Sequence, residues 1–169
     1  MPVSRVLSDA EISDLLAEPK PLPDRFREKL RRRKSKRKPN ELVGKLDIQS
    51  ERGHRFRLTV RVNDQVANNF SVLVVWFTPT GEKILLIRCN GFHERHVNRI
   101  EKTVIPADTC HIHTITERYQ VFGKPDGFAE ETYRYVDVRT AIKHATTHYG
   151  FYRPTKKDSK QPTLPGIDE

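Results

Sequence analysis

Residues 54–62 read His-Arg-Phe-Arg-Leu-Thr-Val-Arg-Val, and this stretch decides the fold class. Phe56, Leu58, Val60 and Val62 alternate along it with three arginines and a threonine. Successive side chains of a β-strand point to opposite faces, so the alternation predicts a strand with one buried face and one basic face. Half-buried strands of this kind are typical of antiparallel sheets.

Four further segments on both sides of this strand have strand character. Residues 70–77 are apolar throughout, which predicts a central strand, and residues 83–89 return after a Thr-Pro-Thr-Gly turn to complete a hairpin. Residues 42–49 predict an earlier strand, and residues 111–120, rich in Ile and Thr, predict a later one. The sequence therefore predicts a mostly antiparallel sheet of about five strands.

Two helices are predicted outside the sheet. Ser8, with Glu11 three positions later, forms the signature of a capping box at the start of a short N-terminal helix. Asp137 is a suitable N-cap for a second helix that runs to about Tyr149 and ends at Gly150. This second helix is expected to cover one face of the sheet, which makes the predicted fold an α+β domain.

The chain of 169 residues has room for one ordinary domain with flanking segments. We expect an N-terminal helix with a Pro-rich connector over 1–23, a basic arm over 24–40, a core domain over 41–152 and a flexible tail over 153–169.

No apolar run approaches the roughly 18–20 residues of a membrane-spanning helix. Only two cysteines are present, which fits a reducing compartment, so we expect a cytoplasmic protein with no membrane contact.

The net charge of +9 comes from one segment. From Arg25 to Lys38 there are ten basic residues against Glu28 alone, whereas the other residues hold 21 basic and 21 acidic side chains. A run of this density repels itself, which predicts a disordered segment or a frayed helix when it is free. Cationic side chains release counterions when they bind phosphates, so the run also predicts contact with nucleic acid. The candidate phosphate-binding residues are Arg31, Arg32, Arg33, Lys34, Lys36, Arg37 and Lys38.

The candidate catalytic residues lie between Arg88 and Gln120. This window holds four of the seven histidines, namely His93, His96, His111 and His113. The last two alternate along a predicted strand and so share a face with Glu117, while the first two follow the strand that ends at residue 89. If the two strands are neighbours, the four imidazole rings converge.

Such a cluster suits a ribonuclease. Imidazole titrates near pH 6.5, so one histidine can take the proton of a ribose 2′-hydroxyl while another protonates the departing 5′-oxygen. Arg88, Arg95 and Arg118 are candidates for holding the phosphate and stabilising its developing charge. The predicted substrate is a nucleic acid, with RNA favoured because the 2′-hydroxyl takes part, and this chemistry needs no cofactor.

The same residues also fit a zinc site. Three neutral imidazoles among His93, His96, His111 and His113, or histidines with Cys110, suit tetrahedral Zn²⁺. Glu94 or Glu117 would then act as general base toward a bound water. The spacing of His111, His113 and Glu117 also resembles the first metal motif of the cupins. A metal-assisted phosphodiesterase is therefore an open alternative.

A longer pattern resembles a group of uncharacterised small proteins from bacteria and their mobile elements. The matching residues are Leu15 to Lys20, Phe56 to Leu58, Arg88 to Gly91, His93 to Asn98 and His111 to Gln120. The resemblance spans about residues 8–150 and implies a toxin or phage-defence role, with an acidic antitoxin as a possible partner.

A non-catalytic reading uses the same sequence. Histidines on a strand often bond to nearby carbonyls, and His144 with His148 is expected on the solvated face of the second helix. Cys89 and Cys110 fit buried apolar positions. In this alternative the protein is a nucleic-acid- or protein-binding module, whose basic arm supplies the affinity.

Overall fold

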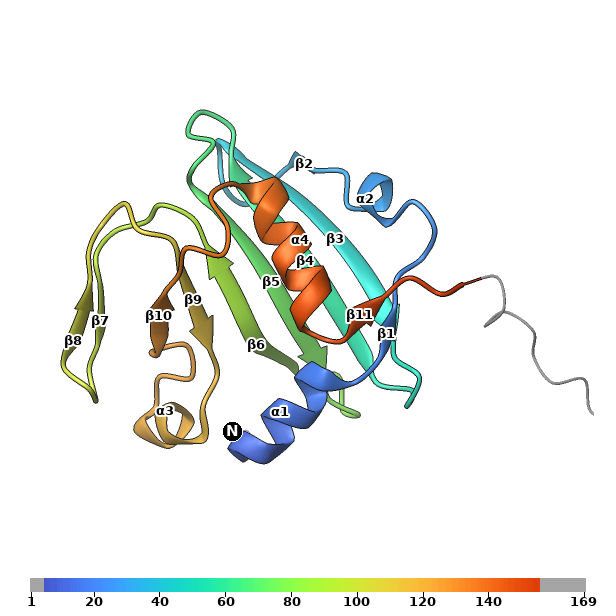
Figure 1. Cartoon of the computed structure of the whole chain (residues 1–169), viewed down its shortest axis with the longest axis horizontal. Helices are drawn as coiled ribbons and strands as arrows, with labels where there is room; N and C mark the ends of the chain where they lie inside the picture. Colours follow the sequence, from blue (N-terminus) through green and yellow to red (C-terminus); the bar gives the residue numbers. More distant parts are fainter. Residues whose placement is uncertain (1–4, 156–169) are drawn as a thin grey trace, which may run out of the picture.

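In the computed structural model, which describes residues 5–155, a twisted antiparallel sheet of seven strands organises the chain (Figure 1). Its order is β10-β9-β6-β5-β4-β3-β2. The strands are β2 (Arg33–Lys34), β3 (Glu41–Gln49), β4 (Arg55–Asn63), β5 (Phe70–Phe77), β6 (Lys83–Asn90), β9 (His111–Thr114) and β10 (Ala129–Glu131). The predicted α+β class and antiparallel sheet are confirmed. The strand number is larger than predicted, because β2 and β10 are too short to show alternation.

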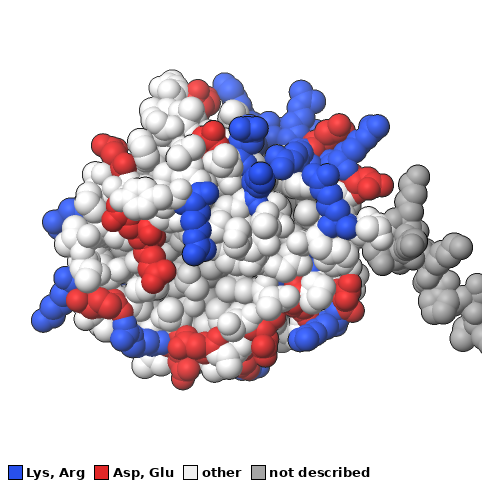
Figure 2. All heavy atoms as spheres, in the orientation of Figure 1, with Lys and Arg blue, Asp and Glu red and all other residues white. Residues whose placement is uncertain are grey.

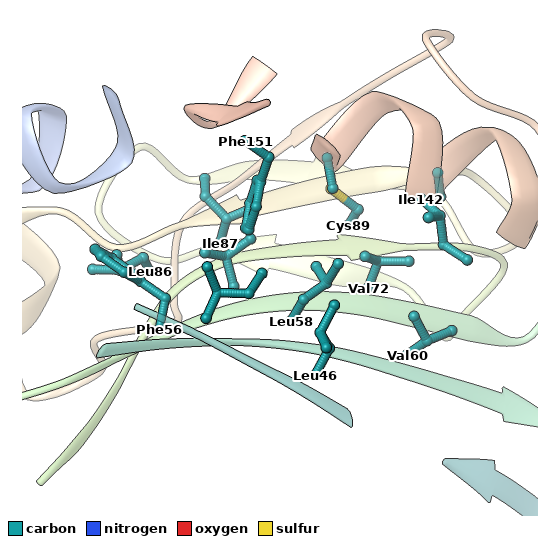
Figure 3. Packing of buried hydrophobic residues seen from close by; sticks show 14 of the residues in the cluster. Leu46, Phe56, Leu58, Val60, Val72, Leu86, Ile87, Cys89, Ile142 and Phe151 are labelled. Carbon is teal, nitrogen blue, oxygen red and sulfur yellow. The ribbon is translucent and has the colours of Figure 1, made fainter. Parts of the chain in front are cut away.

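Helix α4 (Val138–His148) lies across one face of this sheet, as predicted (Figure 1). Asp137 caps it through its side chain, which accepts a hydrogen bond from the main-chain N–H of Thr140 at 2.7 Å. Its apolar side, including Ile142, packs on the inward-facing residues of β4, β5 and β6 (Figure 3). Phe56 and Leu58 of β4 are fully buried there. Burial of alternate residues fixes the register of β4, because a slip of one residue would bring its arginines into the core.

The N-terminal helix α1 (Asp9–Ala17) has the predicted capping box of Ser8 and Glu11. After it, β1 (Lys20–Pro21) pairs in parallel with β11 (Phe151–Tyr152). The ammonium group of Lys20 is buried and donates hydrogen bonds to the carbonyls of Leu15, Leu16, Glu18 and Tyr149 at 2.8–3.0 Å. Lys20 therefore joins the C-terminal end of α1 to the end of α4.

The basic arm is folded against the sheet, which corrects the prediction of a disordered segment or frayed helix. A short helix, α2 (Phe26–Lys29), and the edge strand β2 form within it. Phe26 and Leu30, the apolar residues of the run, are buried in the main core. A Cβ atom added to Gly44 of β3 would lie 2.1 Å from the Leu30 carbonyl oxygen, so the arm rests directly on the β3 backbone.

The segment after β9 also differs from the prediction. The expected strand over 111–120 ends at Thr114, and α3 (Glu117–Phe122) begins soon after it. Thr116 caps this helix by accepting a hydrogen bond from the N–H of Tyr119. A separate hairpin of β7 (His96–Asn98) and β8 (Thr103–Ile105) precedes β9. Of the predicted tail, residues 156–169 lie outside the described part of the chain.

No helix within residues 5–155 combines the length and apolar character that crossing a membrane would require. Cys89 and Cys110 are free thiols and are buried, as expected.

The position of His144 on α4 differs from the prediction. Its side chain was expected in solvent, but only 4 % of its surface is exposed. Its ring packs near Tyr135 and Tyr149, with centroid distances of 5.8 and 5.7 Å.

Candidate active site

The four histidine rings of the 88–120 window lie together. His111 and His113 project from β9, His96 comes from β7, and His93 comes from the loop between β6 and β7. The shortest separation of ring centroids is 4.7 Å, between His96 and His113. His111 lies 5.0 Å from His113, 6.0 Å from His96 and 6.2 Å from His93. The spatial expectation from the sequence is therefore met.

Strand pairing places this cluster on the sheet face opposite α4. Arg88 pairs with His113 and Asn90 pairs with His111 across β6 and β9. The alternate residues, Cys89 and Ile112, belong to the core beneath α4. Side chains alternate between faces, so Arg88 and the histidines of β9 point to the other face.

Each ring donates one N–H to a main-chain carbonyl. The bonds run from His93 Nε2 to Phe70 (3.0 Å), from His96 Nε2 to Gly127 (2.9 Å), from His111 Nδ1 to Thr109 (2.9 Å), and from His113 Nδ1 to Asp126 (2.8 Å). A carbonyl oxygen can only accept, so these bonds place a proton on the named nitrogens. The second nitrogen of each neutral ring then carries a lone pair that can accept a hydrogen bond or a proton.

Asn90 orients His111 from the second side. Its amide donates to His111 Nε2 at 3.3 Å, and its amide oxygen accepts from the Ser71 hydroxyl at 2.7 Å. From the α4 face, the Tyr135 hydroxyl donates to the carbonyls of Asn90 and His111 at 2.8 and 3.0 Å. Ser71 and Tyr135 had no signal in the sequence, because their roles depend on strand register and not on local spacing.

The four rings differ in accessibility. His111 and His113 are 2 % and 6 % exposed, whereas His93 and His96 are half-buried. Burial, together with the nearby Arg88 guanidinium, lowers the pKa of His113 to about 3. Burial also lowers the pKa of His111, and the neighbouring His93 adds to the effect. His111 and His113 are therefore neutral at pH 7, and His93 and His96 are the rings that a substrate can reach.

Arg88 lies beside the cluster, and not all of its N–H donors are used within the described residues. One of its terminal nitrogens contacts Asp126 Oδ2 at 3.1 Å, while its buried Nε has no hydrogen-bond partner among the described residues. Arg88 and His93 line the same hollow, which has a volume of about 410 Å³. A guanidinium in this position can bind an oxygen of a phosphate group.

Within residues 5–155, three other predicted site residues form no side-chain hydrogen bond or ion pair with the cluster. Arg95 is exposed in the loop before β7. Arg118 is exposed on α3 and forms an ion pair with Glu101. Glu117 lies in the exposed first turn of α3, so the strand alternation that placed it beside His113 does not apply. Of the predicted phosphate clamp and acidic group, Arg88 alone is in contact with the histidines.

A preformed metal site is not evident in the described residues. Between residues 5 and 155 no three His, Cys, Asp or Glu side chains are arranged to share a metal ion. The carbonyl bonds orient the rings as they orient metal-bound histidines elsewhere. Acid–base chemistry by single rings needs no shared ligand arrangement, so the geometry of the described residues supports it better than the zinc alternative.

The arm cations line a groove of about 990 Å³. Seven side chains of the arm, with Lys45 and Arg61 of the sheet and Lys83, contribute positive charge to it; the seven are Lys29, Arg31, Arg33, Lys34, Lys36, Arg37 and Lys38. Figure 2 shows Lys and Arg side chains gathered over the region of α2 and β2. Of the predicted arm residues, Arg32 lies outside this groove and lines a neighbouring hollow beside α4.

No protein-family model matches this chain, and no curated protein or solved structure matches it either. The resemblance to small proteins of bacteria and mobile elements therefore stays a prediction. The function has to be inferred from the geometry and the charges of the site.

Proposed function

We propose that this protein is a ribonuclease that cleaves RNA by histidine acid–base chemistry. The observation that supports this best is the convergence of the four rings. Each ring is held by a main-chain carbonyl, which leaves one nitrogen of the accessible His93 and His96 with a lone pair for proton transfer, and Arg88 lies beside the cluster. A cytoplasmic location fits the free thiols, and a toxin or defence role in bacteria follows from the sequence resemblance alone.

In the proposed reaction, His93 and His96 are the acid and the base, because they are the accessible rings. The base takes the proton of the ribose 2′-hydroxyl, and the 2′-oxygen attacks phosphorus as the bond to the 5′-oxygen breaks. The acid gives its proton to that 5′-oxygen. The products are a 2′,3′-cyclic phosphate and a 5′-hydroxyl end, and proton exchange with water restores both rings.

Arg88 and the buried histidines have supporting roles in this proposal. Arg88 would hold a non-bridging oxygen of the phosphate and stabilise the charge that builds on it. His111, fixed between Asn90 and Thr109, would maintain the position of the cluster. The His113 ring contacts the His96 ring. Because His113 is neutral, it adds no second positive charge beside Arg88.

A labelled RNA incubated with the purified protein in excess chelator tests the proposal. RNA should be cleaved, and the same sequence as DNA should stay intact, because DNA has no 2′-hydroxyl. His93→Gln and His96→Gln should each lower the rate about 100-fold or more. His148→Gln, an exposed histidine of α4, is the matched control.

Intact RNA under all conditions would overturn the proposal and favour the non-catalytic binding module. That alternative has one observation in its favour, since His111 and His113 are buried and hydrogen-bonded like structural histidines. Cleavage that stops in chelator would instead support metal-assisted chemistry.

A further inference from the structure

Two hollows meet at one end of the sheet. The hollow of about 410 Å³ beside the histidine cluster is lined by Arg88 and His93, and the groove of about 990 Å³ follows the arm. Lys38, Glu41 and Arg61 line both. The two hollows therefore adjoin, and an RNA strand that leaves the cluster through the first would reach the second.

The first hollow is lined by polar residues at the ends of several strands. The first residues of β3 and β5 and the last residues of β4 and β6 lie at this end of the antiparallel sheet, so they are close together. Lys38, Arg61 and Arg88 supply three positive charges against the one negative charge of Glu41, and Asn63 and Asn69 supply amides. This combination suits a nucleotide, whose phosphate needs cations and whose base edge needs donors and acceptors.

Local hydrogen bonds hold the walls of this hollow. Asn63 Oδ1 accepts from the N–H groups of Gln65 and Val66, both at 2.9 Å. The N–H of Asp64 donates to the Asn40 carbonyl at 2.8 Å, which ties the β4–β5 loop to the turn before β3. The site is therefore built from connected turns and not from independent surface side chains.

The main chain that carries the arm cations of the second groove is also held by hydrogen bonds. The N–H of Ser35 donates to the Glu41 carbonyl at 2.8 Å, and the Ser35 hydroxyl accepts from the N–H groups of Arg37 and Lys38. This turn holds the cations beside the sheet. The residues lining the groove include no aromatic side chain, so the groove is suited to phosphates rather than to stacked bases.

We infer that the hollow lined by Lys38, Arg61, Asn63 and Asn69 is a subsite for the nucleotide next to the scissile phosphate of single-stranded RNA. The following phosphates then lie along the arm groove. This inference rests on the proposed ribonuclease function. A single strand is required because an A-form duplex holds its 2′-oxygens out of line with the leaving 5′-oxygens.

Fluorescence anisotropy with a 2′-O-methyl RNA strand of about 12 nucleotides tests the subsite, because this strand binds without being cleaved. Arg61→Gln and Lys38→Gln should each weaken binding about tenfold and lower the log–log salt slope by about 0.7, the contribution of one phosphate contact on a single strand. Lys143→Gln, an exposed cation of α4 outside both hollows, should leave the Kd and the slope unchanged.

The matching duplex should bind at least tenfold more weakly than the single strand. Equal affinity for the duplex, or equal effects of Arg61→Gln and Lys143→Gln, would overturn the subsite even if RNA is cleaved. Polyglutamate binding that matches RNA and depends equally on Arg61 would overturn it in favour of an acidic protein partner. The expected binding results without cleavage of ordinary RNA would support the subsite and overturn the proposed catalysis.

Discussion

At the scale of the residue, the buried pair His111 and His113 determines how the site responds to pH. Both rings are neutral when folded, because burial penalises their charged forms. In the unfolded chain the same rings titrate near pH 6.5. Acid therefore favours the unfolded state, and the site makes a contribution to stability that is lost as the pH falls below about 6.5.

The free energy of unfolding should fall between pH 6.5 and pH 4, with His113 contributing up to about 1.4 kcal/mol per pH unit. The sign follows from its pKa, which is about 3 in the folded state and lower than in the unfolded state. Urea unfolding at pH 7.5 and pH 5.0 measures the effect. His113→Gln should reduce the pH dependence and exposed His148→Gln should not, so equal slopes for the two variants would contradict the assignment.

Arg88→Gln should lower RNA cleavage about 100-fold, because the phosphate loses its charged partner. It should also raise the pKa of His113, since the guanidinium is one of the causes that lower it. NMR titration of the His113 ring reports the second effect independently of activity. A variant with full activity and an unchanged His113 titration would show that Arg88 does not act on the cluster.

At the scale of the element, the long strands could be predicted and the short ones could not. β3, β4, β5 and β6 lie within about two residues of their predicted positions, because alternation or a continuous apolar run extends over eight or nine residues. β2 and β10 have two and three residues, and their pairing depends on tertiary contacts. The Ile- and Thr-rich run after His111 favoured a longer strand, but the Thr116 cap starts α3 instead.

The candidate site shows the same division. Convergence of the histidines could be predicted because it needs only that β6 and β9 are neighbours. Other features of the site depend on packing between segments that are distant in the sequence. They are the choice of bonded nitrogen in each ring, the hydrogen bonds of Asn90 to His111 and Ser71, and the burial of His144. Docking of the arm could not be predicted from its charge, because Phe26 and Leu30 bury enough apolar surface to hold it.

Gly44→Val should push the arm away from β3 without changing any charge, because a Cβ atom at this position meets the Leu30 carbonyl. Affinity for single-stranded RNA should fall at least tenfold, with some loss of stability. Leu46→Ala, a buried residue of the same strand, should lower stability by about 2–5 kcal/mol and leave the affinity of the folded protein unchanged. Equal affinities for the two variants would mean that docking of the arm is not needed for binding.

At the scale of the whole molecule, the two faces of the sheet have separate roles. One face packs on α4 (Figure 1). Lys20 connects the ends of α1 and α4 through its hydrogen bonds. The other face and one end of the sheet carry the histidines, Arg88 and the two adjoining hollows. The accessible site residues His93, His96 and Arg61 lie outside the hydrophobic core, so variants at these positions are expected to fold.

Lys20→Met should lower the free energy of unfolding by about 3–5 kcal/mol, because it leaves four buried or partly buried carbonyls without their charged donor. Urea unfolding at pH 7 provides the measurement, and Lys124→Met, at an exposed position, is the control. A loss below about 1 kcal/mol would show that Lys20 does not connect the two helices.

Mass spectrometry of the RNA ends produced in excess chelator is the most direct test of the central claim, which is that His93 and His96 cleave RNA as acid and base. The account predicts 2′,3′-cyclic phosphate and 5′-hydroxyl ends, formed by the normal protein and His148→Gln and strongly reduced in His93→Gln and His96→Gln. RNA without new ends, or 5′-phosphate ends, or ends formed equally by all variants, would contradict it.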